Sequence, residues 1–207
     1  MNRNQANGEV PGHGRKTDEA DECGRTVYAG RPTSGALTWH HRVMGTGDSR
    51  DGEHTPTGLV AGLLLAAGSG RRLGRPKALV EVGGERLVDR GVRTLTAGGC
   101  APVMVVLGAA ETVVRGAHTV HNPDWRTGMG SSVRAGIDAL PDSADAVLIA
   151  LADQPLVTPE AVRRLVRAHE QGARAAVATY QGNQRNPVLL GREHWSAAYA
   201  MAVHDVG

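Results

Sequence analysis

The sequence of 207 residues contains no phenylalanine, and aromatic residues make up only 3% of it. A hydrophobic core therefore has to be built from alanine, valine and leucine. Cysteine is also rare: Cys23 and Cys100 are the two present, and they lie in segments of very different character. They show neither the spacing of metal ligands nor that of a disulfide framework, which favours a reducing, cytoplasmic setting.

Long apolar runs and strong charge are absent as well. No run approaches the roughly 18 apolar residues that a membrane span needs. The formal net charge of +2 is too close to balance for a general nucleic-acid or membrane-surface binder. The content of 41% hydrophobic and 21% charged residues is typical of a soluble globular protein.

The first 58 residues differ in composition from the rest. They are rich in glycine and in charges of both signs, and they show no helical or strand periodicity. Such a segment buries too little apolar surface to offset the entropy lost on ordering, so we expect residues 1–58 to be a disordered extension. Its scattered histidines have no metal-ligand spacing. The folded domain is expected to occupy residues 59–207.

Residues 59–207 alternate between strand and helix patterns. The expected strands are residues 59–67, 102–107, 118–121, 145–152 and 174–179; the expected helices are residues 88–95, 131–140 and one opened by Thr158 and Pro159. This alternation predicts a three-layer α/β fold with a mostly parallel sheet. Ligands in such folds bind at the carboxyl ends of the strands, so the chemistry is expected just after Ala67, Val120 and Ala152.

A glycine-rich loop with four cations follows the first expected strand. Glycines at 68, 70 and 74 let backbone amides approach an anion closely. The spacing matches neither a Walker A loop nor the dinucleotide-binding fingerprint. Positive charge on such a loop suits a triphosphate; the alternative is a tight turn with a solvated basic rim. The cations are Arg71, Arg72, Arg75 and Lys77.

The string from Leu65 to Leu79, L-A-A-G-x-G-x-R-x-G-x-P-K-x-L, resembles the signature of MobA-like nucleotidyltransferases, especially molybdenum cofactor cytidylyltransferases. Gly70 and Leu73 depart mildly from that signature. Three further segments match in the expected order, at residues 122–132, 152–155 and 185–188. The resemblance implies a Rossmann-like nucleotidyltransferase fold, in agreement with the strand and helix pattern.

The resemblance also implies roles for individual residues. Arg72 would grip the β- and γ-phosphates, and Lys77 would stabilise charge developing at the α-phosphate. Asp153, at the end of an apolar strand, would hold Mg²⁺, although a loop-ordering aspartate is the alternative. The loop glycines Gly70 and Gly74 would cradle the nucleotide, and the backbone of Ala66, Ala67 and Gly68 would contact its base. The A-A-G of that stretch follows the cytidylyl type, since guanylyl-transferring relatives read A-G-G; it therefore favours CTP.

Four other positions follow from the same resemblance. Asn122 and Ser132 lie in a segment that faces the nucleotide in relatives, but which would also serve as an ordinary helix entry. Asp205 matches a late motif and is a second candidate metal ligand, with His204 in place of the family's glycine. Asn186 stands where many relatives have histidine, which leaves the acceptor open.

The family continues for a few dozen residues beyond Gly207. The resemblance therefore implies a fold that is incomplete at its C-terminus: a fragment, a frameshift product or a shortened variant. Such a chain is expected to be less stable than a longer one, because a missing strand exposes a sheet edge.

The leading hypothesis is a Mg²⁺-dependent nucleotidyltransferase that moves CMP to a phosphorylated acceptor such as molybdopterin cofactor. A molybdoenzyme or its chaperone would be its protein partner; no nucleic acid or membrane is expected. One alternative is an NAD(P)H-dependent oxidoreductase, because actinobacterial proteins similar to this family carry the name nicotine blue oxidoreductase. Another is a non-catalytic nucleotide-binding protein.

Overall fold

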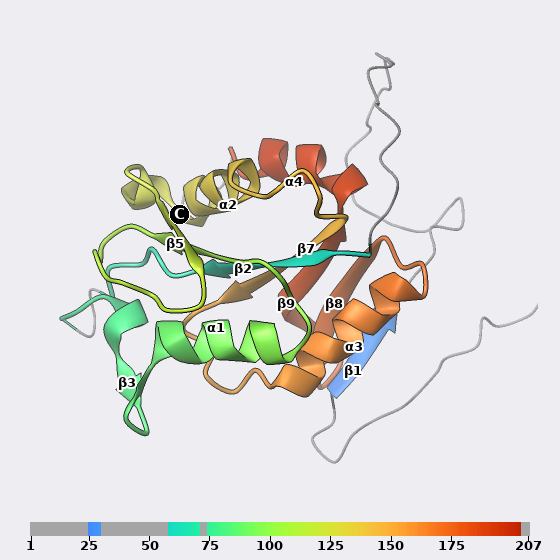
Figure 1. Cartoon of the computed structure of the whole chain (residues 1–207), viewed down its shortest axis with the longest axis horizontal. Helices are drawn as coiled ribbons and strands as arrows, with labels where there is room; N and C mark the ends of the chain where they lie inside the picture. Colours follow the sequence, from blue (N-terminus) through green and yellow to red (C-terminus); the bar gives the residue numbers. More distant parts are fainter. Residues whose placement is uncertain (1–24, 30–57, 71–73, 204–207) are drawn as a thin grey trace, which may run out of the picture.

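The computed structural model describes residues 25–29, 58–70 and 74–203, and it contains a seven-stranded sheet in which four adjacent strands, up to one edge, are parallel. The strand order is β1-β8-β9-β7-β2-β5-β6, and β7, β2, β5 and β6 run parallel to one another. Helices α1 and α3 cover one face of this sheet, and α2 and α4 cover the other (Figure 1). The predicted three-layer α/β fold with a mostly parallel sheet is confirmed.

The elements of the sheet and its helices have the following bounds. The strands are β1 (Arg25–Ala29), β2 (Val60–Leu65), β5 (Val103–Leu107), β6 (His118–His121), β7 (Ala146–Leu151), β8 (Ala175–Tyr180) and β9 (Asn183–Gly191). The helices are α1 (Leu87–Ala97), α2 (Met129–Asp138), α3 (Pro159–Glu170) and α4 (Trp195–Met201). A small hairpin of β3 (Glu81–Val82) and β4 (Glu85–Arg86) and three short 3₁₀ helices, η2 (Lys77–Leu79), η3 (Trp125–Thr127) and η4 (Arg192–His194), complete the described elements.

Strand β2 lies at the centre of the core and is buried along its whole length. Successive side chains of a strand point to opposite faces, so Leu63 and Leu64 belong to the two separate halves of the core. A glycine in a helix meets each of them. A Cβ at Gly91 of α1 would lie 2.7 Å from the Leu64 side chain, and one at Gly136 of α2 would lie 2.5 Å from Leu63. Both helices therefore sit against β2 at a fixed, close distance.

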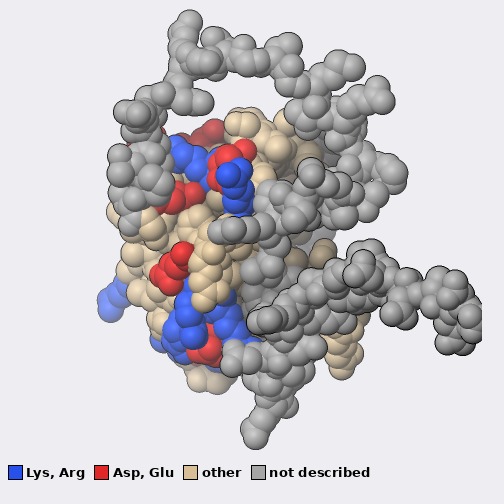
Figure 2. All heavy atoms as spheres, turned by 90° about the vertical axis from the view of Figure 1, so that its right-hand side faces the viewer, with Lys and Arg blue, Asp and Glu red and all other residues tan. Residues whose placement is uncertain are grey.

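Helix α3 begins as the sequence predicts, with Pro159 in its first turn and Thr158 as its N-cap. The Thr158 hydroxyl accepts a hydrogen bond from the Ala161 N–H at 3.3 Å. On the outer face of α3, Glu160 pairs with three arginines, at 2.9, 3.4 and 3.1 Å for Arg163, Arg164 and Arg167. These guanidinium groups lower the pKa of Glu160, chiefly through the hydrogen bond from Arg163. Figure 2 shows basic side chains gathered around an acidic one on this side of the molecule.

The sequence pattern did not fully predict the hairpin of β8 and β9, and it did not predict helix α4. Only the first strand of the hairpin was expected. Strand β9 begins with four polar residues and contains Pro187, so it lacks the apolar run that marks the central strands. It is held by antiparallel pairing with both β7 and β8. Cys100 is buried, and burial raises the pKa of its thiol to about 12, so it stays protonated at neutral pH. No helix among the described residues is long and apolar enough to cross a membrane.

Strand β1 differs from the expectation for residues 1–58, in which no regular element was predicted. It pairs antiparallel with β8, from Arg25 opposite Tyr180 to Ala29 opposite Ala176. An edge strand is held by backbone hydrogen bonds to its neighbour, so its own hydrophobic pattern can be weak. The remaining residues of 1–58 except Gly58 lie outside the described part, and their disorder stays a prediction.

Deletion of residues 1–57 is expected to cause self-association, because it removes β1 and leaves the edge of β8 unpaired. Deletion of residues 1–24 keeps β1 and is the matched control. Size-exclusion chromatography with light scattering compares the two. A monodisperse product of the longer deletion, eluting as the control does, would contradict a protective role for β1.

Candidate active site

The candidate site lies at the edge where β2, β5 and β7 end. Their pairing continues just past the strands and then stops. The Ala66 N–H donates to the Val106 carbonyl at 2.9 Å, and the Ala67 carbonyl accepts from the Ala109 N–H at 3.1 Å. On the other side, the Ala152 N–H donates to the Leu65 carbonyl at 3.0 Å. The segments after β2 and β7 are therefore held beside each other as they leave the sheet.

This arrangement brings together two residues that the sequence analysis singled out. The Lys77 Nζ donates a hydrogen bond to Asp153 Oδ2 at 2.7 Å, across 76 positions in the sequence. Their side chains are 47% and 37% exposed. An ion pair this open to solvent contributes little to stability. The pair lies at the carboxyl edge of the sheet, which is where α/β folds commonly bind their ligands.

The glycine loop is folded tightly against the segment that leads to Lys77. Gly70 has φ +60°, and a Cβ there would lie 2.1 Å from the Arg75 carbonyl oxygen and 3.1 Å from the Lys77 backbone N. Gly74 also has a positive φ, of +66°, but nothing lies within 4 Å of its Cβ position. Gly70 thus makes a close approach that no other residue allows, whereas Gly74 meets a conformational requirement alone.

Gly70→Ala is expected to disturb the site more than Gly74→Ala. Both substitutions place an alanine at a positive φ, which is strained, but only the Cβ at position 70 collides with the backbone of Arg75. We expect the Gly70 variant to lose about 2 kcal/mol or more of unfolding free energy, and the Gly74 variant about 1 kcal/mol. Chemical denaturation measures both. Equal losses would show that the contact between residues 70 and 75 does not constrain the loop.

Asn122 and Ser132 are close together but point inward. Asn122 is 2% exposed and Ser132 4%. The Asn122 Nδ2 donates to the hydroxyls of Ser131 at 2.9 Å and Ser132 at 3.0 Å, and its Oδ1 accepts from the Asp124 N–H at 2.9 Å. This network joins the end of β6 to the first turn of α2. Their contact with a nucleotide stays a prediction, and their observed role is to shape the entry to the helix.

Gly108 is a site-shaping residue that the sequence analysis missed. A Cβ there would lie 2.5 Å from the Trp125 Cβ and 2.9 Å from the Ala67 Cβ. Trp125 therefore lies beside the segment predicted to contact the base, and the Arg126 guanidinium sits 4.6 Å from the centre of its ring. A glycine directly after an apolar strand was the available signal, but it does not reveal which side chain it admits.

The remaining predicted residues have the following outcomes. Arg72 and Asp205 lie outside the described residues, so their roles stay predictions. Gly68 is exposed, and the Ala66 N–H and Ala67 carbonyl already bond to residues 106 and 109. Contact of this stretch with a base would have to use its other backbone groups.

The donor set around Asp153 fits one kind of metal site. Within residues 58–70 and 74–203, no group of three or more His, Cys, Asp or Glu side chains is placed to hold a metal ion. Mg²⁺ is commonly bound through one or two carboxylates together with substrate phosphates. A single exposed aspartate beside a lysine fits an ion that arrives with a nucleotide, and does not fit an all-protein metal cage.

Comparison with known proteins gives a family and several relatives. The family model of the MobA-like NTP transferase domain matches residues 62–207. The nicotine blue oxidoreductase of Paenarthrobacter nicotinovorans is 44% identical over 142 residues, which cover 65% of this chain and 68% of that protein. The 2-C-methyl-D-erythritol 4-phosphate cytidylyltransferase of Rhodococcus jostii (strain RHA1) is 35% identical over 127 residues, covering 58% of this chain and 55% of that protein. The chain thus spans little more than half the length of the cytidylyltransferase.

Solved structures share the fold. Rv0371c from Mycobacterium tuberculosis H37Rv superposes with a TM-score of 0.60 at 22% identity, covering 70% of this chain and 77% of the other. A structure of Rv0371c in complex with manganese has a TM-score of 0.56 at 20% identity, covering 68% and 75% of the two chains. At these identities the likeness establishes the architecture alone.

Proposed function

We propose that this chain, which belongs to the family of MobA-like NTP transferase domains, transfers a nucleoside monophosphate from an NTP to a phosphorylated acceptor and releases pyrophosphate. The observation that carries the proposal is the pairing of Lys77 with Asp153 at 2.7 Å, at the carboxyl edge of the sheet. Lys77 supplies a cation for the phosphates, and Asp153 supplies a carboxylate for a metal ion.

In the proposed reaction, a phosphate oxygen of the acceptor attacks the α-phosphorus. The bond from that phosphorus to the oxygen bridging to the β-phosphate breaks, and pyrophosphate leaves with the electron pair. Lys77 binds the α-phosphate and stabilises the negative charge that develops there. Gly70 holds the loop closed against residues 75–77 and so keeps the lysine in place. Asp153 would hold Mg²⁺, which when bound would neutralise phosphate charge.

The nucleotide and the acceptor are narrower parts of the proposal. CTP is favoured by the A-A-G stretch of residues 66–68 and by similarity to a protein named as a cytidylyltransferase. Molybdopterin cofactor is the acceptor that the family resemblance favours. A molybdoenzyme or its chaperone would receive the product, in the cytoplasm. The manganese in a structural neighbour supports the use of a divalent ion.

A second candidate function has a specific observation behind it, namely 44% identity over 68% of a protein named nicotine blue oxidoreductase. It would require an NAD(P)H site in place of an NTP site. The Lys77–Asp153 pair favours the transferase, because a lysine and a metal-binding carboxylate serve a triphosphate and have no evident task in hydride transfer. A nucleotide-binding protein without turnover is the third alternative.

A thermal-shift panel distinguishes these functions, since a ligand that binds only the folded state raises its melting temperature. The ligands are Mg²⁺ with CTP, GTP or ATP, and NADPH separately. Selective stabilisation by Mg·CTP supports the transferase and its nucleotide. A rise in melting temperature with NADPH alone favours the oxidoreductase. Binding of Mg·CTP without release of pyrophosphate in the presence of any acceptor favours the non-catalytic protein.

A further inference from the structure

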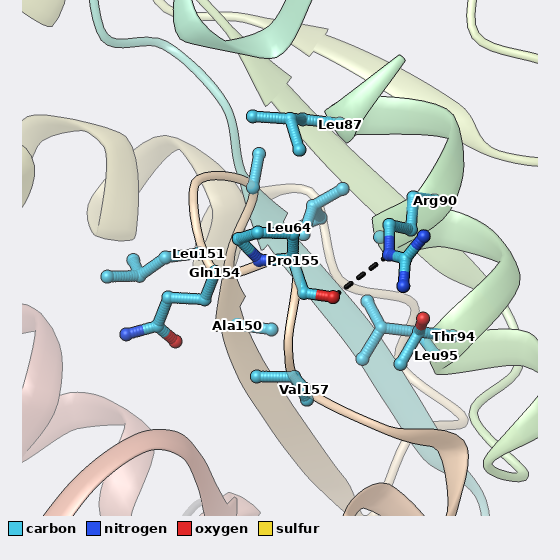
Figure 3. Close-up of a pocket in the computed structure, with 12 residues that line it drawn as sticks. Leu64, Leu87, Arg90, Thr94, Leu95, Ala150, Leu151, Gln154, Pro155 and Val157 are labelled. Carbon is cyan, nitrogen blue, oxygen red and sulfur yellow. Dashed lines mark hydrogen bonds between the residues drawn. The ribbon is translucent and has the colours of Figure 1, made fainter. Parts of the chain in front are cut away.

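Arg90 in α1 reaches across to the loop that carries Asp153. Its Nε donates a hydrogen bond to the Pro155 carbonyl at 2.9 Å, shown as the dashed line in Figure 3. Pro155 lies two residues after Asp153, in the connection between β7 and α3. The Arg90 side chain is 35% exposed, so the contact is partly protected from water. A helix on one side of the sheet is thereby tied to the loop of the candidate metal ligand.

The helix that bears Arg90 is itself fixed to the sheet. The neighbouring Gly91 packs so closely on β2 that a Cβ would come within 2.7 Å of Leu64. Between α1, the sheet and the loop lies a cavity of about 20 Å³, with room for about one water molecule. Arg90 and Pro155 both line this cavity (Figure 3). The Arg90 side chain therefore connects a helix that is packed tightly on the sheet with the loop on the other side of this small cavity.

The hydrogen bonds within the loop that carries Asp153 are longer than the hydrogen bond from Arg90. The Gln154 N–H donates to the Leu151 carbonyl at 3.3 Å, and the Val157 N–H donates to the Gln154 carbonyl at 3.2 Å. Leu156, between these turns, is 79% exposed and packs little. The bond from Arg90 is shorter than either turn contact and comes from outside the loop. It therefore constrains the direction in which the chain leaves Asp153.

From this geometry we infer that Arg90 is a positioning residue for Asp153: it holds the loop at Pro155 so that the carboxylate faces Lys77 and the incoming metal ion. The inference rests on the proposed function, since it assigns Arg90 a task in the same site. Groups that orient a metal ligand typically change metal affinity or activity by about 10- to 100-fold when removed.

Arg93, one turn further along α1, provides a matched control. Glu85 receives two hydrogen bonds from Arg93, at 2.9 and 2.8 Å, whereas the Arg90 Nη1 lies 3.7 Å from the Glu85 carboxylate. The hydrogen bond from Arg93 is the main cause of the lowered pKa of Glu85. Removal of Arg93 thus deletes one cation and one ion pair from the same helix without touching the loop.

The test compares Arg90→Ala, Arg90→Lys and Arg93→Ala with the wild type. The two readouts are the dissociation constant of Mn·CTP from isothermal titration calorimetry and the metal concentration for half-maximal pyrophosphate release. Arg90→Ala is expected to raise both by about tenfold or more, with Arg93→Ala unchanged. Arg90→Lys keeps one donor near Pro155 and should fall between them. Circular dichroism melting shows whether each variant is folded.

The outcomes separate the inference from the proposed function. If the wild type binds Mn·CTP and the Arg90 and Arg93 variants bind it equally well, Arg90 has no positioning role. If Arg90→Ala unfolds, Arg90→Met carries the comparison, because methionine keeps an unbranched side chain but has no donor for the Pro155 carbonyl: a folded methionine variant with wild-type metal dependence overturns the inference. A wild type that binds none of CTP, GTP and ATP with Mn²⁺ and releases no pyrophosphate from any of them refutes the proposed function, and the inference falls with it.

Discussion

Lys77→Ala is expected to lower the rate of pyrophosphate release by about 10²- to 10³-fold, which is typical for the loss of one group that stabilises transition-state charge. The side chain is 47% exposed, and its ion pair with Asp153 is open to solvent. The melting temperature should therefore stay within about 2 °C of the wild type. Steady-state assays of pyrophosphate release, together with a melting curve, measure both effects.

Arg167→Ala is the control for this variant. Like Lys77→Ala, it removes one cation and one exposed ion pair, here with Glu160, but it does so on the outer face of α3. It should leave the rate unchanged. Pyrophosphate release by Lys77→Ala at the wild-type rate would exclude the proposed role of the lysine, and an equal loss in both variants would point to a general charge effect.

Asp153→Asn is expected to separate metal dependence from nucleotide binding. The substitution keeps the shape of the side chain and removes its charge. The metal concentration for half-maximal turnover should therefore rise about 10- to 1000-fold, which is the range expected when a metal ion loses its attraction to one carboxylate charge near the protein surface. Affinity for CTP without metal should rise instead, because Lys77 no longer shares its charge with a carboxylate at 2.7 Å. Calorimetric titrations with CTP in EDTA and in Mg²⁺ give both numbers.

Asp138→Asn serves as the control, because that carboxylate lies at the end of α2 and accepts a hydrogen bond from Tyr199 at 3.3 Å. It should match the wild type in both titrations. Unchanged metal dependence in Asp153→Asn, or weaker binding of metal-free CTP than in the wild type, would show that Asp153 does not act as proposed.

The central strands and their order along the chain could be predicted from the sequence because β2, β5 and β7 are buried almost throughout and carry continuous apolar runs. Strands β1 and β9 could not be predicted in this way. Both are held by antiparallel neighbours, so their positions depend on backbone pairing and leave a weak trace in hydrophobicity. The expected order of strands brings the segments after β2 and β7 to the same carboxyl edge of the sheet, and Lys77 and Asp153 meet there at 2.7 Å. Their roles toward a ligand stay predictions.

The contacts that hold the site in place could not be predicted from the sequence. Arg90 reads as an ordinary exposed residue of an amphipathic helix, and its bond to Pro155 depends on how closely Gly91 lets α1 approach β2. Asn122 shows a similar limit. The sequence shows the motif that contains it, but does not reveal that its side-chain amide is hydrogen-bonded to Ser131, Ser132 and Asp124. Such hydrogen-bond partners depend on packing between residues far apart in the sequence, which the spacing of residues along the chain does not reveal.

The most direct test of the central claim is a transfer assay with the wild-type chain, Mg²⁺, CTP labelled at its α-phosphate and molybdopterin as acceptor. The account predicts that label moves to the acceptor and that an equal amount of pyrophosphate is released, with far less in Lys77→Ala. The claim of nucleotidyl transfer would be contradicted if no NTP yields pyrophosphate with this acceptor while NADPH is oxidised in the presence of nicotine blue.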